Sequence, residues 1–144
     1  MEKQTFKNHI RFYTPHHFIF YPIILTFIVF SIYFSFTAKD KLIWAFISGI
    51  FLVLLFLAFM VRQHYALTLQ NRIVRLELRY RYLALSGKRF ETIENRLKDD
   101  QIFALRFAPD EELEGLIDKT LSENFSGTQI KKAIINWNGD YERV

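Results

Sequence analysis

Three histidines stand where the chain could hold a cofactor. His16 and His17 lie at the start of a long uncharged stretch, and His64 follows a second one. If the two stretches pair as antiparallel helices, His16 and His64 are nearly equidistant from the connecting turn and lie at the same depth. Paired imidazoles in such a place can ligate haem or a transition metal, or hold a quinone head group. Cofactor binding by His16, His17 and His64 is therefore one hypothesis for this chain.

The remaining residues favour a protein without catalysis. Metal sites usually recruit a third or fourth ligand, and neither cysteine nor carboxylate adjoins these histidines, which can serve instead as polar anchors. The acid clusters 99–100 and 110–112 fall at predicted helix starts, where capping and the helix dipole explain them. No Gly-x-Ser-x-Gly, phosphate-binding glycine loop or HExxH motif occurs, and the chain has no cysteine. We predict no catalytic residue, no metal and no cofactor.

The two uncharged stretches are Phe18–Ala38 and Leu42–Val61, separated only by the charged turn 39–41. Each has about 20 residues and as a helix reaches ~30 Å, the thickness of a bilayer's hydrocarbon core. The first stretch is too long for a signal peptide, and a second one follows it directly. We expect an all-α membrane protein with a two-helix transmembrane hairpin, its spans at about 15–38 and 42–61.

Charge is segregated along the chain and predicts the orientation of the hairpin. The net charge is +4, but residues 62–98 carry nine basic against three acidic side chains, whereas residues 99–144 carry five basic against ten acidic. Lys and Arg near span ends are retained on the cytoplasmic side. We therefore expect a multi-pass protein of the inner (cytoplasmic) membrane with both termini in the cytoplasm.

Small residues indicate where the two spans touch. Ser31 and Ser35 in the first span and Ala45 and Gly49 in the second lie at similar distances from the turn. Such small-xxx-small pairs let helix backbones approach closely in lipid, so we predict helix–helix packing at these four positions. No ionisable side chain lies within either span, so we expect no proton relay and no ion site there.

The second helix has no stop signal at the membrane surface. No Gly or Pro occurs from Arg62 to Leu85, so we expect a cytoplasmic extension over about 62–86 that ends at Ser86-Gly87. This extension carries two apolar stripes. One comprises Leu69, Ile73, Leu76, Tyr80 and Leu83, and the other Leu67, Val74, Leu78 and Leu85. Either the chain's own C-terminal helices cover both stripes, or one face binds another subunit or a second copy in a coiled coil. As the face for lipid or partner binding we assign the second stripe, Leu67, Val74, Leu78 and Leu85.

Three arginines, Arg72, Arg75 and Arg79, form a basic stripe beside these apolar residues. Their charge fits the cytoplasmic topology by itself. They could also bind anionic lipid head groups, each charge being worth about 1 kcal/mol near the surface, or the phosphates of RNA, as on a ribosome. Anionic lipid is the favoured partner, because the basic residues give way to an acidic segment further along the chain.

The segment after Gly87 is predicted to hold three or four short amphipathic helices. Ala108-Pro109 and the following acids indicate one helix start, and Ser126 with Gln129 fits a capping box. We expect residues 1–86 to form the hairpin with its extension and residues 87–144 a cytoplasmic short-helix domain. The polar N-terminal residues 1–14 suit the membrane head-group region, and Pro22 predicts a bend in the first span.

Four segments together resemble a family of small bacterial two-span membrane proteins catalogued as a domain of unknown function. These are Pro15–Phe18, Arg62–Glu77, Ala104–Ala108 and Ile130–Trp137, and the resemblance runs nearly end to end. It implies the two-span architecture and carries no activity, cofactor or partner.

Taken together, the sequence favours a non-catalytic integral subunit or adaptor of the bacterial inner membrane. Its cytoplasmic helix and helical cap would dock onto a larger membrane complex, such as translocation or insertion, respiratory or secretion machinery, or onto a second copy as a homo-oligomer. The alternative is a small haem-, metal- or quinone-binding redox protein that uses the three histidines. RNA or ribosome contact is a further possible interaction.

Overall fold

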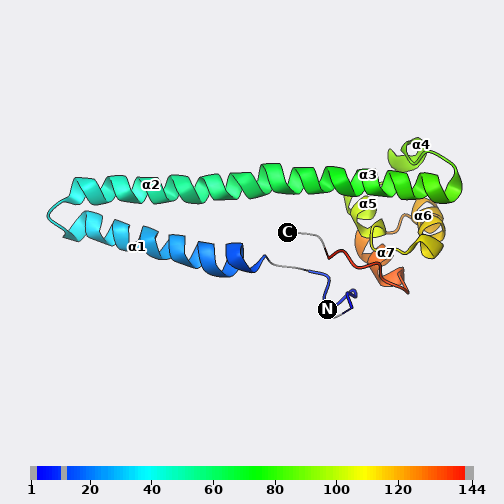
Figure 1. Ribbon diagram of the computed structural model, residues 1–144, viewed down its shortest axis with the longest axis horizontal. Coiled ribbons are helices and arrows are strands. Elements are labelled where there is room, and N and C mark those ends of the chain that lie inside the picture. The colour runs from blue at the N-terminus through cyan, green and yellow to red at the C-terminus, as the bar shows by residue number, and fades with distance from the viewer. Residues whose placement is uncertain (1–2, 11–12, 142–144) are drawn as a thin grey trace. The chain divides into compact units, whose positions relative to one another are not determined.

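The computed structural model describes residues 3–10 and 13–141, and all regular structure within them is helical (Figure 1). These residues divide into two compact units, 13–68 and 3–10 with 69–141. The helices run, in chain order, η1 (Pro15–Phe20), α1 (Tyr21–Thr37), α2 (Lys41–Met60), η2 (Val61–Ala66), α3 (Leu67–Ser86), α4 (Glu91–Glu94), α5 (Asp99–Leu105), α6 (Asp110–Glu123) and α7 (Gly127–Ala133), where η marks a π-helical segment.

The first unit is the expected helical hairpin. Helix is continuous over Pro15–Thr37, 23 residues, and over Lys41–Ser86, 46 residues, and both helices are long and apolar enough to cross a membrane by length and composition. Helices α1 and α2 run side by side in opposite directions from the turn between them (Figure 1). The prediction of two long apolar helices packed as a hairpin is confirmed.

Aromatic pairs and two serines form the contact between α1 and α2. Phe27 stacks on Phe51 with ring centroids 5.2 Å apart, and Phe34 lies against Trp44 at 4.8 Å. Ser31 is buried in α1, as is Ser48 in α2. Their hydroxyls donate to carbonyls of their own helices, Ile28 at 3.0 Å and Trp44 at 2.9 Å. The serines therefore give close packing without leaving a buried hydroxyl unsatisfied.

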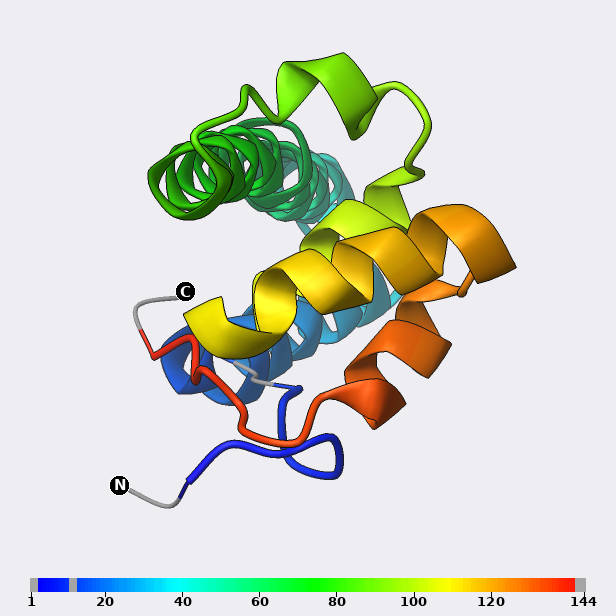
Figure 2. The ribbon, with the colours of Figure 1, turned by 90° about the vertical axis from the view of Figure 1, so that its right-hand side faces the viewer.

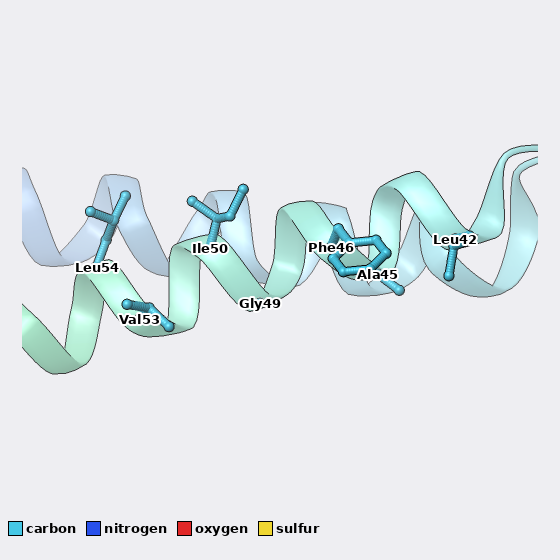
Figure 3. Close-up of a pocket in the computed structure, with 7 residues that line it drawn as sticks. All are labelled: Leu42, Ala45, Phe46, Gly49, Ile50, Val53 and Leu54. Carbon is cyan, nitrogen blue, oxygen red and sulfur yellow. The ribbon is translucent and has the colours of Figure 1, made fainter.

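The small residues of α2 are not used as expected. A Cβ added at Gly49 would meet nothing within 4 Å, which places this residue outside the contact with α1. Ala45 and Gly49 instead line an apolar groove on α2, together with Leu42, Phe46, Ile50, Val53 and Leu54 (Figure 3). Distance from the turn predicts depth but not rotation about the helix axis, and Ser48 is the α2 residue that lies buried against α1. In α1, Ser31 is buried as predicted and Ser35 is half-buried.

The first helix opens with a π-helical segment rather than with a capped α-turn. Thr14 precedes it with helical backbone angles, and its side chain makes no cap hydrogen bond. The N–H of Tyr21 donates to the carbonyl of His16, five residues earlier. Pro22 has no N–H and its ring crowds the carbonyl of Phe18, and a wider turn before it relieves both problems. A second π-helical segment, η2, joins α2 to α3.

The second unit packs its short helices around one face of α3. Leu78 is 1% exposed, and Phe90, Ile102, Leu105 and Phe107 are equally buried around it. Gly87 ends α3 with φ +68°, a conformation open to glycine. Helices α4 to α7 agree with the predicted set of short amphipathic helices, and Ser126 accepts from the N–H of Gln129 in the predicted capping box.

The N-terminal residues belong to this second unit. Gln4 is 4% exposed, its amide donates to the carbonyl of Asp140 at 3.2 Å, and the N–H of Asp140 donates back to it at 2.9 Å. His9 packs against the rings of both Phe107 and Trp137. Residues 3–10 are thus held by the chain's own C-terminal segment. The units also divide near residue 68 rather than at 86, because α3 supplies part of the C-terminal core.

Replacement of Ser31 by leucine should weaken the hairpin. The new side chain has no space between α1 and α2, and overpacking of this kind costs about 1–3 kcal/mol of unfolding free energy. Gly49→Leu is the matched control, because its Cβ enters open space. Denaturant titration of the purified protein in detergent, followed by circular dichroism, gives both values. Equal destabilisation by the two variants would contradict the observed rotation of α2.

Candidate interaction site on α3

One face of α3 is apolar and exposed. Its members are spaced alternately by four and three residues, so they line up along the helix. Their side chains are between 47% and 72% exposed, and we call them the exposed stripe: Leu69, Ile73, Leu76, Tyr80 and Leu83. An apolar row of this size on an otherwise charged helix is typical of an interaction surface.

The opposite apolar stripe is largely used within the chain. Val74 and Leu78 are 5% and 1% exposed, and Leu67 is half-buried. Leu85, near the end of the helix, stays exposed. Leu78 lies in the core with residues of the C-terminal helices, so it is used by contacts inside the unit, and the burial of Val74 likewise removes it from the predicted partner-binding face. The chain thus covers one of its two stripes and leaves the other open.

Two of the three predicted basic-stripe residues are paired with carboxylates. Arg75 donates to Glu94 at 2.8 Å and to Asp99 at 2.6 Å, and Arg79 lies 2.7 Å from the other oxygen of Glu94. Glu94 is only 11% exposed, so it holds both arginines against α4. This pairing reduces the positive charge that Arg75 and Arg79 can offer to anionic lipid or to RNA, and binding of either remains a prediction.

Arg75 keeps its charge in this setting. Partial burial opposes the charged guanidinium, but the hydrogen bonds to Glu94 and Asp99 and the charges of these carboxylates outweigh that effect and raise the pKa of Arg75. A charge-assisted hydrogen bond is roughly twice as strong as a neutral one. The ion pairs of Arg75 with Glu94 and Asp99 therefore fix α4 and the start of α5 to one flank of α3.

Arg81 performs the corresponding task on the other flank. Its guanidinium lies 2.7 Å from Asp110 and donates to the carbonyls of Ala108 at 2.7 Å and Arg106 at 3.3 Å. The start of α6 is thereby held to α3, and Figure 2 shows α4 and α6 on different sides of the helix. Sequence reasoning counted Arg81 as one basic residue among nine. Its position beside the buried stripe, next to Tyr82, was the available signal for a structural role.

Arg72 and Glu77 remain on the two edges of the exposed stripe. Within residues 3–10 and 13–141, neither side chain forms an ion pair. Both are exposed and both lie about 60–80° from the centre of the stripe on a helix of 3.6 residues per turn. A cation and an anion thus border the apolar row on opposite sides.

The three histidines lie at the base of the hairpin but are not gathered around one point. His16 and His17 are neighbours in η1 with ring centroids 5.6 Å apart, and His17 Nδ1 lies 3.0 Å from the carbonyl of Tyr13. In the aromatic pairs across the hairpin the two residue numbers add up to 78, which puts Arg62 rather than His64 opposite His16.

The chemistry open to these histidines is limited by their neighbours. His64 is exposed on η2 and His16 is half-buried beside the positive charge of Arg62. In the described part of the chain, no group of three or more His, Asp or Glu side chains converges as a metal site. His16 Nε2 is buried and makes no hydrogen bond within the described residues.

Glu94→Gln should destabilise the second unit. The change removes the anion shared by Arg75 and Arg79, and the loss of charged hydrogen bonds at a mostly buried site costs about 1–3 kcal/mol. Glu91 on the same short helix is the control, since its pair with Arg89 is long at 3.3 Å and exposed. Hydrogen exchange of α4 amides and denaturant unfolding measure the difference. Equal effects of Glu94→Gln and Glu91→Gln would contradict the anchoring role.

Comparison with known proteins gives a family without an assigned role. No curated protein and no solved structure matches the chain. One family model matches residues 1–144, the whole length of the sequence. The chain therefore belongs to DUF6526, a family of unknown function.

Proposed function

We propose that this protein is a non-catalytic integral membrane adaptor, anchored by the α1–α2 hairpin and contacting a larger membrane complex through its second unit. The observation that carries the proposal is the surface of the hairpin. Large side chains such as Val29, Phe36, Leu42 and Phe46 are 65–74% exposed, and no charged residue lies between the turn and either base. Such a surface is costly in water and favourable in lipid.

The placement of charged residues supports the membrane orientation predicted above, with both termini in the cytoplasm. The basic residues Lys39 and Lys41 at the turn are balanced in part by Asp40, whereas the base of the hairpin is followed by Arg62 and by the arginines of α3. Under the positive-inside rule, the base and both termini face the cytoplasm. The second unit, with the exposed stripe, then lies in the cytoplasm.

The second unit supports an adaptor more than an enzyme. Two of its largely buried charged groups, Arg81 and Glu94, serve to fix helices to α3. Its open surface includes an ordered apolar row, which is a recognition feature. The partner that fits this surface is therefore a protein within a membrane complex.

Membrane integration is tested on the full chain in its native membrane. Carbonate extraction should leave the protein in the membrane pellet, and tags at either terminus should be protected from protease in intact cells but digested once the membrane is opened. Release by carbonate, or tags on opposite faces of the membrane, would overturn the proposed anchor. A tag-free sample confirms that the tags do not alter insertion.

Participation in a larger complex needs a separate measurement. After gentle detergent extraction, the protein should migrate on native gels with an assembly much larger than two copies of its 17.3 kDa chain. Mass spectrometry of that band identifies the other subunits. Recovery of the protein only by itself, at every detergent concentration that keeps known membrane complexes intact, would contradict the adaptor role.

The buried, unpartnered Nε2 of His16 favours one second candidate, a haem-, metal- or quinone-binding protein. In that case, the purified protein should carry a visible absorption band or a bound metal, and His16→Ala should remove it while His64→Ala, on the exposed segment η2, should not. Under the adaptor proposal, neither signal is present and both variants behave as the parent protein. Absorption spectroscopy and metal analysis separate the two candidates.

A further inference from the structure

We infer that the exposed stripe of α3 is covered by a second copy of this chain, in a parallel two-stranded coiled coil. The stripe has the alternating spacing of four and three residues that defines heptad positions a and d. Ile73 and Tyr80 occupy a, and the three leucines Leu69, Leu76 and Leu83 occupy d. A β-branched residue at a with leucine at d favours two parallel strands.

The charges beside the stripe complement each other across such a dimer. Arg72 occupies position g and Glu77 position e of the following heptad. In a parallel pair, a g side chain meets the e side chain five residues later on the other helix, so Arg72 of each copy reaches Glu77 of the other. The two pairs are equivalent by symmetry. Both residues are exposed and form no ion pair in the described residues, which leaves them open for this contact.

The next heptad agrees with this arrangement. Arg79 also occupies position g, but the residue five positions later is Ala84, which needs no charge partner. Arg79 is already paired with Glu94 of its own chain. In an antiparallel arrangement, g positions face g positions, and Arg72 and Arg79 of the two copies would repel each other. The charge pattern thus selects the parallel arrangement.

The remainder of the unit leaves the stripe accessible. Leu78, which contacts the C-terminal core, lies about 180° around α3 from Leu69 on a helix of 3.6 residues per turn. Helices α4 to α7 therefore cover the face away from the stripe. A second copy can approach along the stripe without displacing the contacts of Arg75, Arg79 or Arg81.

The inference rests on the proposed membrane anchor in one respect. Copies inserted in one bilayer with the same topology are related by a two-fold axis along the membrane normal. A stripe of five residues is too short for a stable coiled coil between free helices in water. Anchoring raises the local concentration of copies and offsets part of the cost of association.

Single cysteines test the contact directly, because the natural chain contains none. Leu76→Cys and Leu83→Cys at d positions bring their sulfur atoms within disulfide range in the parallel dimer, whereas Asn71→Cys, exposed at position f, points away. Mild oxidation of native membranes should give a disulfide dimer for both d variants, at a level about tenfold above that of Asn71→Cys. Equal levels at all three positions would overturn the proposal.

Charge exchange tests the ion pairs in the Leu76→Cys background. Arg72→Glu and Glu77→Arg each replace two attractive pairs by two repulsive ones and should lower dimer formation about fivefold to tenfold. The double variant restores opposite charges and should recover the parent level. Glu114→Arg, an equal change of charge at an exposed position of α6, should have no effect. A double variant as weak as the single ones would contradict the Arg72–Glu77 contact.

The outcomes distinguish this inference from the membrane proposal. If carbonate releases the protein but Leu76→Cys still cross-links, the proposed dimer is supported and the proposed membrane anchor is contradicted. If the protein resists carbonate extraction but the cysteines at d positions form no dimer, the membrane anchor is supported and the proposed dimer is contradicted. Cross-linking of Leu76→Cys to a different protein, at the expense of its own dimer, would also overturn the second copy as occupant.

Discussion

The contact between α3 and the helices that follow it is the interaction on which the second unit depends. Helices α4, α5 and α7 have only four to seven residues, and helices of this length are unstable alone in water. They acquire stability by packing on Leu78 and its neighbours, and the arginines of α3 fix their positions. Burial supplies the driving force, while Glu94 and Asp110 select which helix lies on which flank.

The same arginines show that much of the segregated charge is paired within the second unit. The sequence places basic residues before Lys98 and acidic ones after it, and the fold brings members of the two groups together. Arg75 and Arg81 each meet a carboxylate from the acidic half within 2.8 Å. Much of the positive charge of α3 is therefore paired inside the unit. Of the three arginines in the basic stripe, Arg72 alone forms no ion pair within the described residues.

Sequence reasoning predicted the elements well and their rotations poorly. Length and lack of charge located the two long helices, and the Ser126 capping box located α7, because these signals are local. The two stripes of α3 are similarly apolar, so periodicity could not tell that Leu78 would be buried and Leu76 exposed. Depth counted from the turn could not decide whether Ser48 or Gly49 faces α1, since adjacent residues differ by about 100° around a helix.

Long-range pairings escaped prediction for a related reason. Nothing in the local sequence links Glu94 to Arg75 and Arg79, and nothing in a polar N-terminal segment indicates that Gln4 hydrogen-bonds to Asp140. His16 and His64 were predicted to lie opposite each other because they are nearly equidistant from the turn. The aromatic pairs across the hairpin instead put Arg62 opposite His16. The candidate surface on α3 was recognised from spacing alone, and its free face became identifiable only from burial.

The Gln4–Asp140 contact has a consequence for biosynthesis. It joins positions 136 apart in the chain, so the amino-terminal segment must wait until Asp140 has left the ribosome before it meets its partner. Closing so long a loop is entropically expensive and comes late among folding events. A nascent chain that stalls before Asp140 consequently leaves Phe107 and the amino-terminal segment without their final contacts.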